Sequence, residues 1–187
     1  MNKIDRALRV LAISGSLRSA SSNGALVHAL SRVAPDIVDV SIYDGLAGVP
    51  AFNPDHDGES PAAAVSEFRS ALQACDAVVI SSPEYAHGVP GALKNALDWV
   101  VGSGELIDKP IALINVSPHS TFAQASLKET LTVMSAKVVP EASITLPLAG
   151  RKLDANGIAA DRELSVALRS AMLSLSLAAR GPRSAAS

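Results

Sequence analysis

The chain has 187 residues, of which 48% are hydrophobic and 18% are charged, and its formal net charge is −2. This length fits one compact domain, and the apolar content is too high for a disordered chain. The small net charge argues against a nucleic-acid-binding domain, which normally carries a surplus of basic residues. No segment approaches the roughly 18 consecutive apolar residues that a membrane-spanning helix needs.

The chain contains one cysteine, Cys75. A single thiol excludes an internal disulfide and a cysteine-based zinc site, and its position before an apolar strand favours a small buried residue. No cluster of His, Asp or Glu has the spacing of metal ligands, so no metal is expected. The segment from Met1 to Arg9 has mixed charge and lacks the apolar core of a signal peptide, so the expected compartment is the cytoplasm.

Short β-branched runs alternate with helical patterns along the chain. The runs predict strands at Val10–Ile13, Ile37–Ile42, Ala77–Ile80, Ile111–Val116 and Val138–Leu146. The patterns predict helices at Gly24–Val33, Pro61–Ala74, Ala92–Val101, Phe122–Ala136 and Ala160–Ala179. This order requires a mostly parallel sheet with helices on both faces. The predicted fold is an α/β three-layer sandwich of the flavodoxin-like type, with strand order 2-1-3-4-5.

Several local features refine this prediction. Asn23 and Ser60 are the expected N-caps of the first two helices, and the fourth helix is expected to follow Ser120 and Thr121. One domain is expected over residues 1–182, followed by a frayed tail at 183–187. The irregular segment 43–59 is long for a compact domain, so it is expected to be functional or mobile.

Ligands of an open parallel sheet bind beyond the carboxyl ends of its strands, which directs attention to the loop after the first strand. The segment Ser14 to Gly24 is rich in hydroxyls, and free N–H groups at the start of the next helix favour an anion. Ser16, Ser21, Asn23 and Arg18 together supply donors for a phosphate monoester. The alternative is an ordinary surface turn with a helix cap. The segment is neither a Walker loop nor a Gly-x-Gly-x-x-Gly fingerprint.

The loop after the third strand is stiffened by Pro83 and Pro90. Tyr85 stands near the strand's carboxyl end, where a flat ring could pack against it. In the helix that follows, Lys94 and Asp98 are expected to form an i,i+4 pair. Trp99 belongs either to the core or to a subunit interface.

Two motifs occupy these loops. The first is Gly15-Ser16-Leu17-Arg18 followed by Ser21-x-Asn23, and the second is Pro83-Glu84-Tyr85 followed by Pro90-Gly91-x-Leu93-Lys94-Asn95-Ala96-x-Asp98-Trp99. Together they resemble the NADPH-dependent FMN reductase family, a flavodoxin-like group that includes bacterial quinone, chromate and azo-dye reductases. The resemblance extends from Val10 to about Ala179.

The resemblance implies non-covalent FMN, with the serines, Arg18 and Asn23 at its phosphate and the second loop along its ring. The expected cofactor-binding residues are Ser16, Arg18, Ser21, Ser22, Asn23, Pro83, Glu84, Tyr85, Ala86, His87, Gly88 and Ser117. NAD(P)H is the expected co-substrate, in a ping-pong transfer of hydride to a quinone, a free flavin, an azo compound or a chromate-like oxyanion. The cofactor carries this chemistry, so no catalytic side chain is expected. A homodimer or homotetramer is also implied, with the helix that bears Trp99 as its interface.

The sequence departs from the family at two places. The family often has Asn-Gly-Ser where this chain has Ala86-His87-Gly88, and it often has a glycine-rich third loop where this chain has Ser117 to Thr121. His87 and His119 either line the acceptor pocket or face solvent. Two other functions stay open. One is a flavodoxin-like electron carrier, or a flavin-binding protein without nicotinamide turnover, although such carriers tend to be strongly acidic. The other is an interaction module that has lost its flavin.

Overall fold

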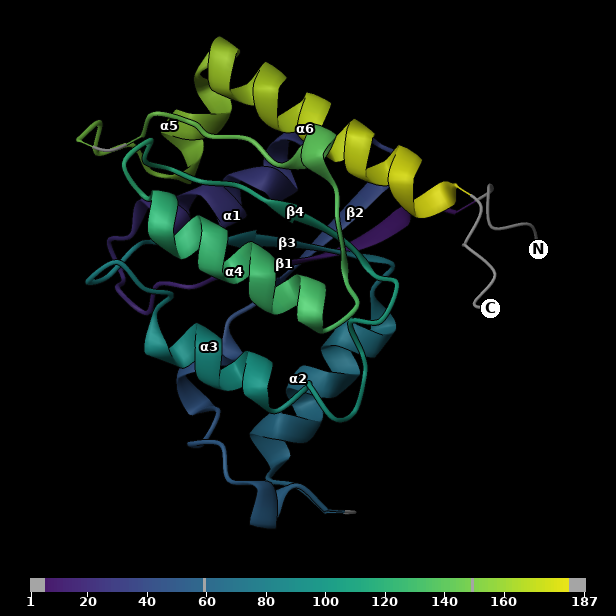
Figure 1. Cartoon of the computed structure of the whole chain (residues 1–187). Coiled ribbons are helices and arrows are strands. Elements are labelled where there is room, and N and C mark those ends of the chain that lie inside the picture. The colour runs from purple at the N-terminus through teal and green to yellow at the C-terminus, as the bar shows by residue number, and fades with distance from the viewer. Residues whose placement is uncertain (1–5, 59, 149, 182–187) are drawn as a thin grey trace.

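The computed structural model describes residues 6–58, 60–148 and 150–181. Five parallel strands form one sheet in the order β2-β1-β3-β4-β5 (Figure 1), which confirms the predicted 2-1-3-4-5 topology. The strands are β1 (Leu8–Ser14), β2 (Val38–Tyr43), β3 (Ala77–Ser81), β4 (Pro110–Leu113) and β5 (Lys137–Val138). The helices are α1 (Ser22–Val33), α2 (Ala63–Ala74), α3 (Gly91–Asp98), α4 (Thr121–Val133), α5 (Ala155–Ala160) and α6 (Arg162–Arg180).

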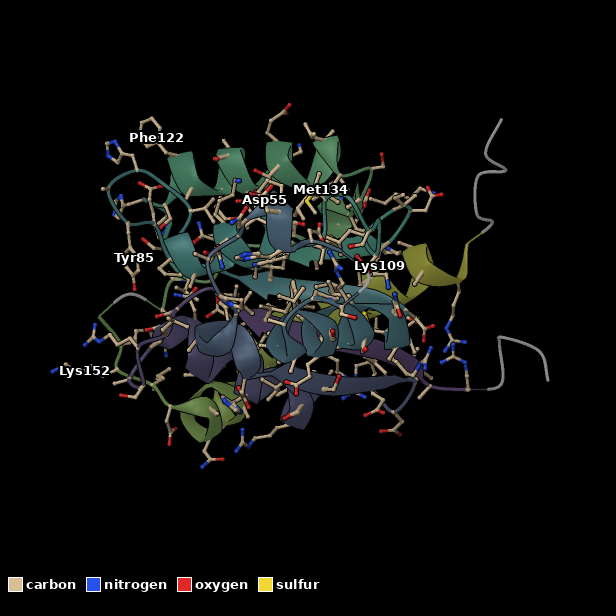
Figure 2. The ribbon with its side chains drawn as sticks, turned by 90° about the horizontal axis from the view of Figure 1, so that it is seen from below. Asp55, Tyr85, Lys109, Phe122, Met134 and Lys152 are labelled. Atoms are coloured by element: carbon tan, nitrogen blue, oxygen red, sulfur yellow. The ribbon has the colours of Figure 1, made fainter. Side chains whose placement is uncertain are left out.

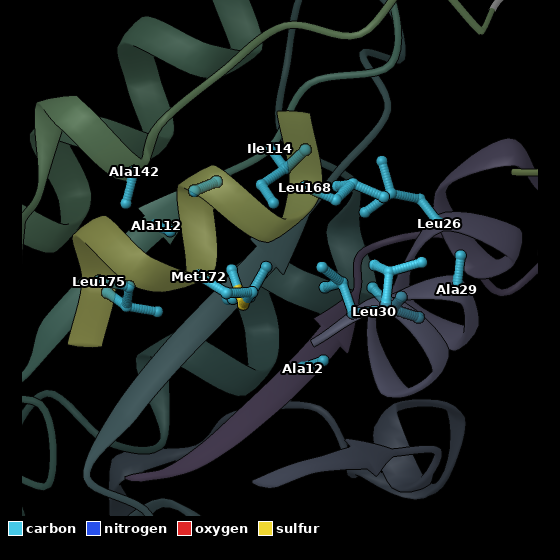
Figure 3. Packing of buried hydrophobic residues seen from close by; sticks show 14 of the residues in the cluster. Ala12, Leu26, Ala29, Leu30, Ala112, Ile114, Ala142, Leu168, Met172 and Leu175 are labelled. Carbon is cyan, nitrogen blue, oxygen red and sulfur yellow. The ribbon is translucent and has the colours of Figure 1, made fainter. Parts of the chain in front are cut away.

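Helices cover both faces of the sheet, because successive side chains of each strand point to opposite sides. Val10 and Ala12 of β1 face the core beneath α1 and α6, whereas Leu11 and Ile13 face the core beneath α2, α3 and α4. In the first core, Leu30 of α1 and the α6 side chains lie over the small residues of the sheet (Figure 3). This three-layer packing leaves the loops at the carboxyl ends of the strands free to form a site.

The predicted start of two helices was wrong by a few residues. Ser21, rather than Asn23, caps α1, and its side chain accepts hydrogen bonds from the N–H groups of Asn23 and Gly24. The helix α2 begins at Ala63 without a side-chain cap. Ser120 does hold the N-cap position of α4, but its side chain makes no capping bond.

The fifth strand is shorter than the predicted Val138–Leu146. Only Lys137–Val138 pair with β4, and a 3₁₀ turn at Pro140–Ala142 follows. Pro140 lacks the N–H that a ladder needs, so the strand cannot continue through it. The chain returns to the sheet at Thr145, which forms an isolated bridge with Asn115.

The last predicted helix, Ala160–Ala179, corresponds to α6, and the short helix α5 precedes it where no helix was predicted. Asp154 accepts a hydrogen bond from Gly157 N–H as the cap of α5, and Asp161 accepts from Glu163 N–H and Leu164 N–H as the cap of α6. The aspartate at 161 therefore ends one helix and starts the next. The expected stop at Gly181 is confirmed, and the tail 183–187 lies outside the described residues.

The long segment after β2 contains two 3₁₀ turns, Gly45–Gly48 and Pro54–His56. It is fixed to α3 and its cap residue, since Asn95 Oδ1 accepts a hydrogen bond from Phe52 N–H at 2.7 Å and Trp99 Nε1 donates to Pro50 O at 2.8 Å. Trp99 is only 1% exposed within this single chain. The tryptophan is therefore a core residue that also anchors this segment.

The amino ends of the strands carry a group of charged residues. Arg6 and Arg9 both donate to the carboxylate of Asp76, and Arg180 at the end of α6 donates to the carbonyl oxygen of Arg6 at 3.0 Å. The neighbouring Cys75 is buried, as expected, and burial raises the pKa of its thiol.

Two features are absent from the residue ranges that the structure describes. No helix there is long and apolar enough to cross a membrane. No group of three or more His, Cys, Asp or Glu side chains there is arranged to hold a metal ion.

Candidate cofactor site

The loops after β1 and β3 meet closely at Gly15. Its N–H donates to Ser81 O at 2.8 Å, and a Cβ added to this glycine would lie 2.5 Å from Ser82 Oγ. Ser81 Oγ also donates to Asn23 Oδ1 at 2.9 Å, and both of these side chains are buried. The two loops therefore form one rigid unit, and only a residue without a side chain fits between them.

The β1 loop is folded by its own hydroxyls. Ser14 Oγ accepts from Ser16 N–H at 3.2 Å, and Ser16 Oγ accepts from Arg18 N–H at 3.4 Å. The Ser21 hydroxyl caps α1 at distances of 3.2 and 3.3 Å. The side chain of Arg18 is exposed, and within the described chain it makes no ion pair.

This donor set fits a phosphate group. The segment from Ser14 to Gly24 supplies hydroxyls, helix-start amides and one guanidinium, and it contains no carboxylate. Such a set stabilises a doubly charged anion without a competing negative charge. Asn23 differs from the expected picture, because its side-chain carbonyl is already bonded to Ser81. Its role at the phosphate stays a prediction, as do those of Ser16, Arg18, Ser21 and Ser22.

The loop after β3 closes in a tight turn. Tyr85 and Gly88 exchange both backbone hydrogen bonds, at 3.1 and 2.9 Å. Between them, Ala86 and His87 have φ of 49° and 60°. Two consecutive residues with positive φ are typical of a type I′ turn, for which Asn-Gly is the preferred pair. The alanine and histidine therefore adopt a backbone conformation that glycine or asparagine would adopt at lower cost.

Tyr85 connects this turn to the phosphate loop. Its hydroxyl lies 3.5 Å from Ser16 Oγ, and its side chain is 53% exposed. The structure thus brings together two residues that the sequence assigned to the phosphate end and the ring end of one cofactor. In Figure 2, Tyr85 lies at the same end of the molecule as Phe122 and Lys152, with Lys109 toward the opposite end.

The loop after β4 is organised by Asn115, which sequence reasoning missed. Its Oδ1 accepts from Ser117 N–H at 3.1 Å, and its Nδ2 donates to Ser117 O at 2.6 Å. Ser117 Oγ accepts from His119 N–H at 3.3 Å. An asparagine directly after an apolar strand is a recognisable signal for such an Asx turn. This bonding gives the third loop a defined path without glycines.

A second missed residue is Phe122, in the first turn of α4. Its ring stacks on His87 with centroids 4.3 Å apart and an interplanar angle of 19°. Glu84 joins the same two segments, because its Oε2 accepts from Ala123 N–H at 2.8 Å. His87 and His119 are both exposed. The loops after β3 and β4 therefore converge, as the topology predicted, through contacts that no local motif indicates.

The chain is similar in sequence and in structure to known flavin-dependent reductases. An NAD(P)H-dependent FMN reductase of Pseudomonas aeruginosa is 32% identical over 155 residues, covering 80% of this chain and 83% of the relative. A quinone reductase of Escherichia coli K12 is 33% identical over 141 residues, covering 71% and 73%. Among solved structures, the flavoenzyme NAD(P)H:acceptor oxidoreductase FerB of Paracoccus denitrificans superposes with a TM-score of 0.71 at 26% identity, covering 91% of this chain and 98% of FerB. The family model for NADPH-dependent FMN reductases matches residues 8–150. The chain therefore belongs to the NADPH-dependent FMN reductase family.

Proposed function

We propose that this chain is an FMN-dependent NAD(P)H oxidoreductase that reduces quinone-type acceptors. The observation that carries the proposal is the approach of Ser16 and Tyr85, whose hydroxyls lie 3.5 Å apart. This contact joins the β1 loop, which is rich in hydrogen-bond donors for a phosphate, to the turn Tyr85–Gly88, which is suited to line the edge of a flat ring. Relatives named as FMN reductase, 2-hydroxy-1,4-benzoquinone reductase and quinone reductase support both the cofactor and the acceptor class.

The residues of this chain bind and position rather than react. Arg18 offsets the phosphate charge and the loop serines donate hydrogen bonds to the phosphate, while the Gly15 contact holds their loop against the ring loop. The turn Tyr85–Gly88 lines the ring, and the bond from Glu84 to Ala123 N–H fixes the turn's base. When bound, FMN supplies the hydride-accepting and hydride-donating ring. The exposed face beside Tyr85 leaves one open place that NAD(P)H and the acceptor use in turn.

The proposal also includes two properties of the whole protein. We place it in the cytoplasm, in line with its single cysteine. We also propose a homodimer or homotetramer, in line with the family resemblance. Light scattering coupled to size-exclusion chromatography measures the second property directly, and a monomer at micromolar concentration would exclude it.

Anaerobic flavin spectroscopy tests the activity. The purified protein is loaded with FMN, NADPH is added without oxygen, and a benzoquinone follows. We expect the visible flavin absorbance to bleach with NADPH and to return with the quinone. A yellow protein that NADPH and NADH leave unbleached would indicate an electron carrier. A protein that takes up no FMN would exclude both functions.

A further inference from the structure

A large groove extends from the phosphate loop along α1. Its volume is about 880 Å³, within the roughly 300–1,000 Å³ range of sites that enclose small organic ligands. Besides the β1 loop, it is lined by one side of α1, by the segment Tyr43–Ala47 and by the residues that lead into α5. A phosphate group alone occupies only a small part of such a volume.

The groove lies on the far side of the phosphate loop from the ring loop. Its described lining includes Ser14 and the residues 16–22, whereas the turn Tyr85–Gly88 lies outside it. Figure 2 agrees, since Lys152 of the groove rim and Phe122 lie on opposite sides of Tyr85. FMN held with its ring beside Tyr85 would therefore place only its phosphate at one end of the groove. The remaining volume is large enough to take a further organic group.

The charges of the groove favour an anion near the phosphate loop. Arg18 and Lys152 are both exposed on its rim, and neither forms an ion pair within the described part of the chain. Arg32 adds a third cation farther along α1, where its guanidinium donates to His28 O at 2.8 Å. The lining also contains two carboxylates, Asp44 and Asp154. Asp154 accepts a hydrogen bond from Gly157 N–H as the cap of α5.

Another part of the lining, between α1 and the segments near Leu46 and Leu153, is apolar. Val27 and Leu46 are buried, Leu153 is half-buried, and Ala47 is small and exposed. An apolar wall beside cations is suited to a flat base attached to a phosphorylated sugar. Cations bind the phosphate, while the side chains of the wall cover the base.

We propose that this groove binds the adenylate half of a dinucleotide. The inference rests on the proposed function, because the cradle for the flavin phosphate forms one end of the groove. In FAD the adenylate is attached to that same phosphate, so its second phosphate would follow directly beside Arg18 and Lys152. The adenylate of NADPH has the same chemistry and is the other source.

Calorimetric titration of the flavin-free protein with FMN, FAD and 5′-AMP tests the proposal. We expect FAD to bind at least as tightly as FMN, and 5′-AMP to bind weakly to the same protein. Two variants probe the groove. Lys152→Glu reverses a rim charge, and Ala47→Trp fills the apolar part. Each is expected to weaken adenylate binding about tenfold, and FMN binding far less.

Matched variants on α4 serve as controls. Lys128→Glu and Ala125→Trp make the same changes at exposed positions away from the groove, so they are expected to leave all three affinities unchanged. If the groove variants weaken FAD and AMP, the adenylate belongs to FAD. If they weaken AMP and raise the KM for NADPH while FAD is unaffected, it belongs to the co-substrate. Both outcomes support the proposal.

Different results would disprove the adenylate site and the proposed function. If AMP and FAD affinities and the KM for NADPH are the same in the groove variants and the wild type, the adenylate assignment is overturned, although FMN binding and turnover persist. If the wild type does not bind FMN at all, the function itself is excluded.

Discussion

The carboxylate of Glu84 accepts a hydrogen bond from the backbone N–H of Ala123 at 2.8 Å. Together with the stacking of His87 on Phe122, this contact joins the ring loop after β3 to the first turn of α4. It also satisfies one of the N–H groups that a helix start leaves without an internal partner, and it places a negative charge at the favourable end of the helix. The glutamate that the sequence placed beside the cofactor thus also anchors a helix.

Replacing Glu84 should loosen this connection. We expect Glu84→Ala to lower the free energy of unfolding by about 1–2 kcal/mol, because the helix start loses both its acceptor and its charge. Glu84→Gln keeps an acceptor oxygen and should lose less. Urea unfolding followed by circular dichroism measures both. Equal stability of Glu84→Ala and the wild type would contradict a capping role.

The Arg18 side chain should act on the cofactor and not on the fold. Since it is exposed and makes no ion pair in the described ranges, we expect Arg18→Ala to leave the unfolding transition unchanged. Loss of a charged donor to phosphate should weaken FMN binding about tenfold to a hundredfold. Flavin fluorescence titration checks this, with the exposed Arg162→Ala as the control. Unchanged FMN affinity in Arg18→Ala would refute the phosphate assignment.

The contact at Gly15 allows a steric test. A methyl group there would lie 2.5 Å from Ser82 Oγ and 3.0 Å from Leu93 Cδ2. We expect Gly15→Ala to destabilise the protein by about 1–3 kcal/mol and to weaken FMN binding, because the two loops must separate. Gly48→Ala is the matched control, since nothing lies within 4 Å of its added Cβ. Thermal unfolding with and without FMN distinguishes the two variants.

A substitution at Ala86, in the turn after Tyr85, should raise the stability of the protein. Ala86 has φ of 49°, a conformation that costs an ordinary residue roughly 1–2 kcal/mol and glycine little. Ala86→Gly is therefore expected to raise the melting temperature, and Ala86→Asn should do the same to a smaller extent. Ala86→Val should lower it, because a β-branched residue tolerates this conformation least. A lower melting temperature for both Gly and Asn would mean that the turn differs in solution.

The pH dependence of stability should depend on Asp76. Burial by itself raises the pKa of this carboxyl, but the hydrogen bonds from Arg6 and Arg9 outweigh burial and hold the pKa well below its usual range. A carboxyl with a lowered folded-state pKa stabilises the fold above its unfolded pKa of about 3.9, and that stabilisation is lost as the pH falls toward the folded value.

We therefore expect Asp76→Asn to be less stable than the wild type at pH 7. Its stability should also fall less steeply than that of the wild type between about pH 5 and pH 2. Urea unfolding at a series of pH values measures this, with the exposed Asp36→Asn for comparison. Parallel pH profiles for Asp76→Asn and the wild type would rule out this linkage.

The sequence predicted the sheet because parallel topology follows from the alternation of strands and helices. Once the order was known, the loops after β1 and β3 had to lie at one edge, and the approach of Ser16 and Tyr85 agrees with this. The errors arose where one residue outweighed a pattern. Pro140 ended an apolar run that otherwise resembled a strand, and Asp154 caps the short helix α5, which no apolar pattern indicated.

Other features depend on contacts between distant segments. The stacking of His87 on Phe122 requires the loop after β3 to meet the start of α4, and no local pattern specifies that meeting. The groove along α1 depends on the segments near Ala47 and Lys152, which only the folded chain brings together. Asn115 is different, since its position after a strand was visible in the sequence and its turn could have been predicted.

The hydrogen bond from Arg180 to the carbonyl oxygen of Arg6 has a practical consequence for engineering. It holds the end of α6 beside the start of β1. This is the amino end of the strands, opposite the loops that carry the serines and Tyr85. Chains whose first and last elements adjoin tolerate circular permutation and fusion. A fusion partner placed at this end of the strands would therefore lie away from the loops that carry the serines and Tyr85.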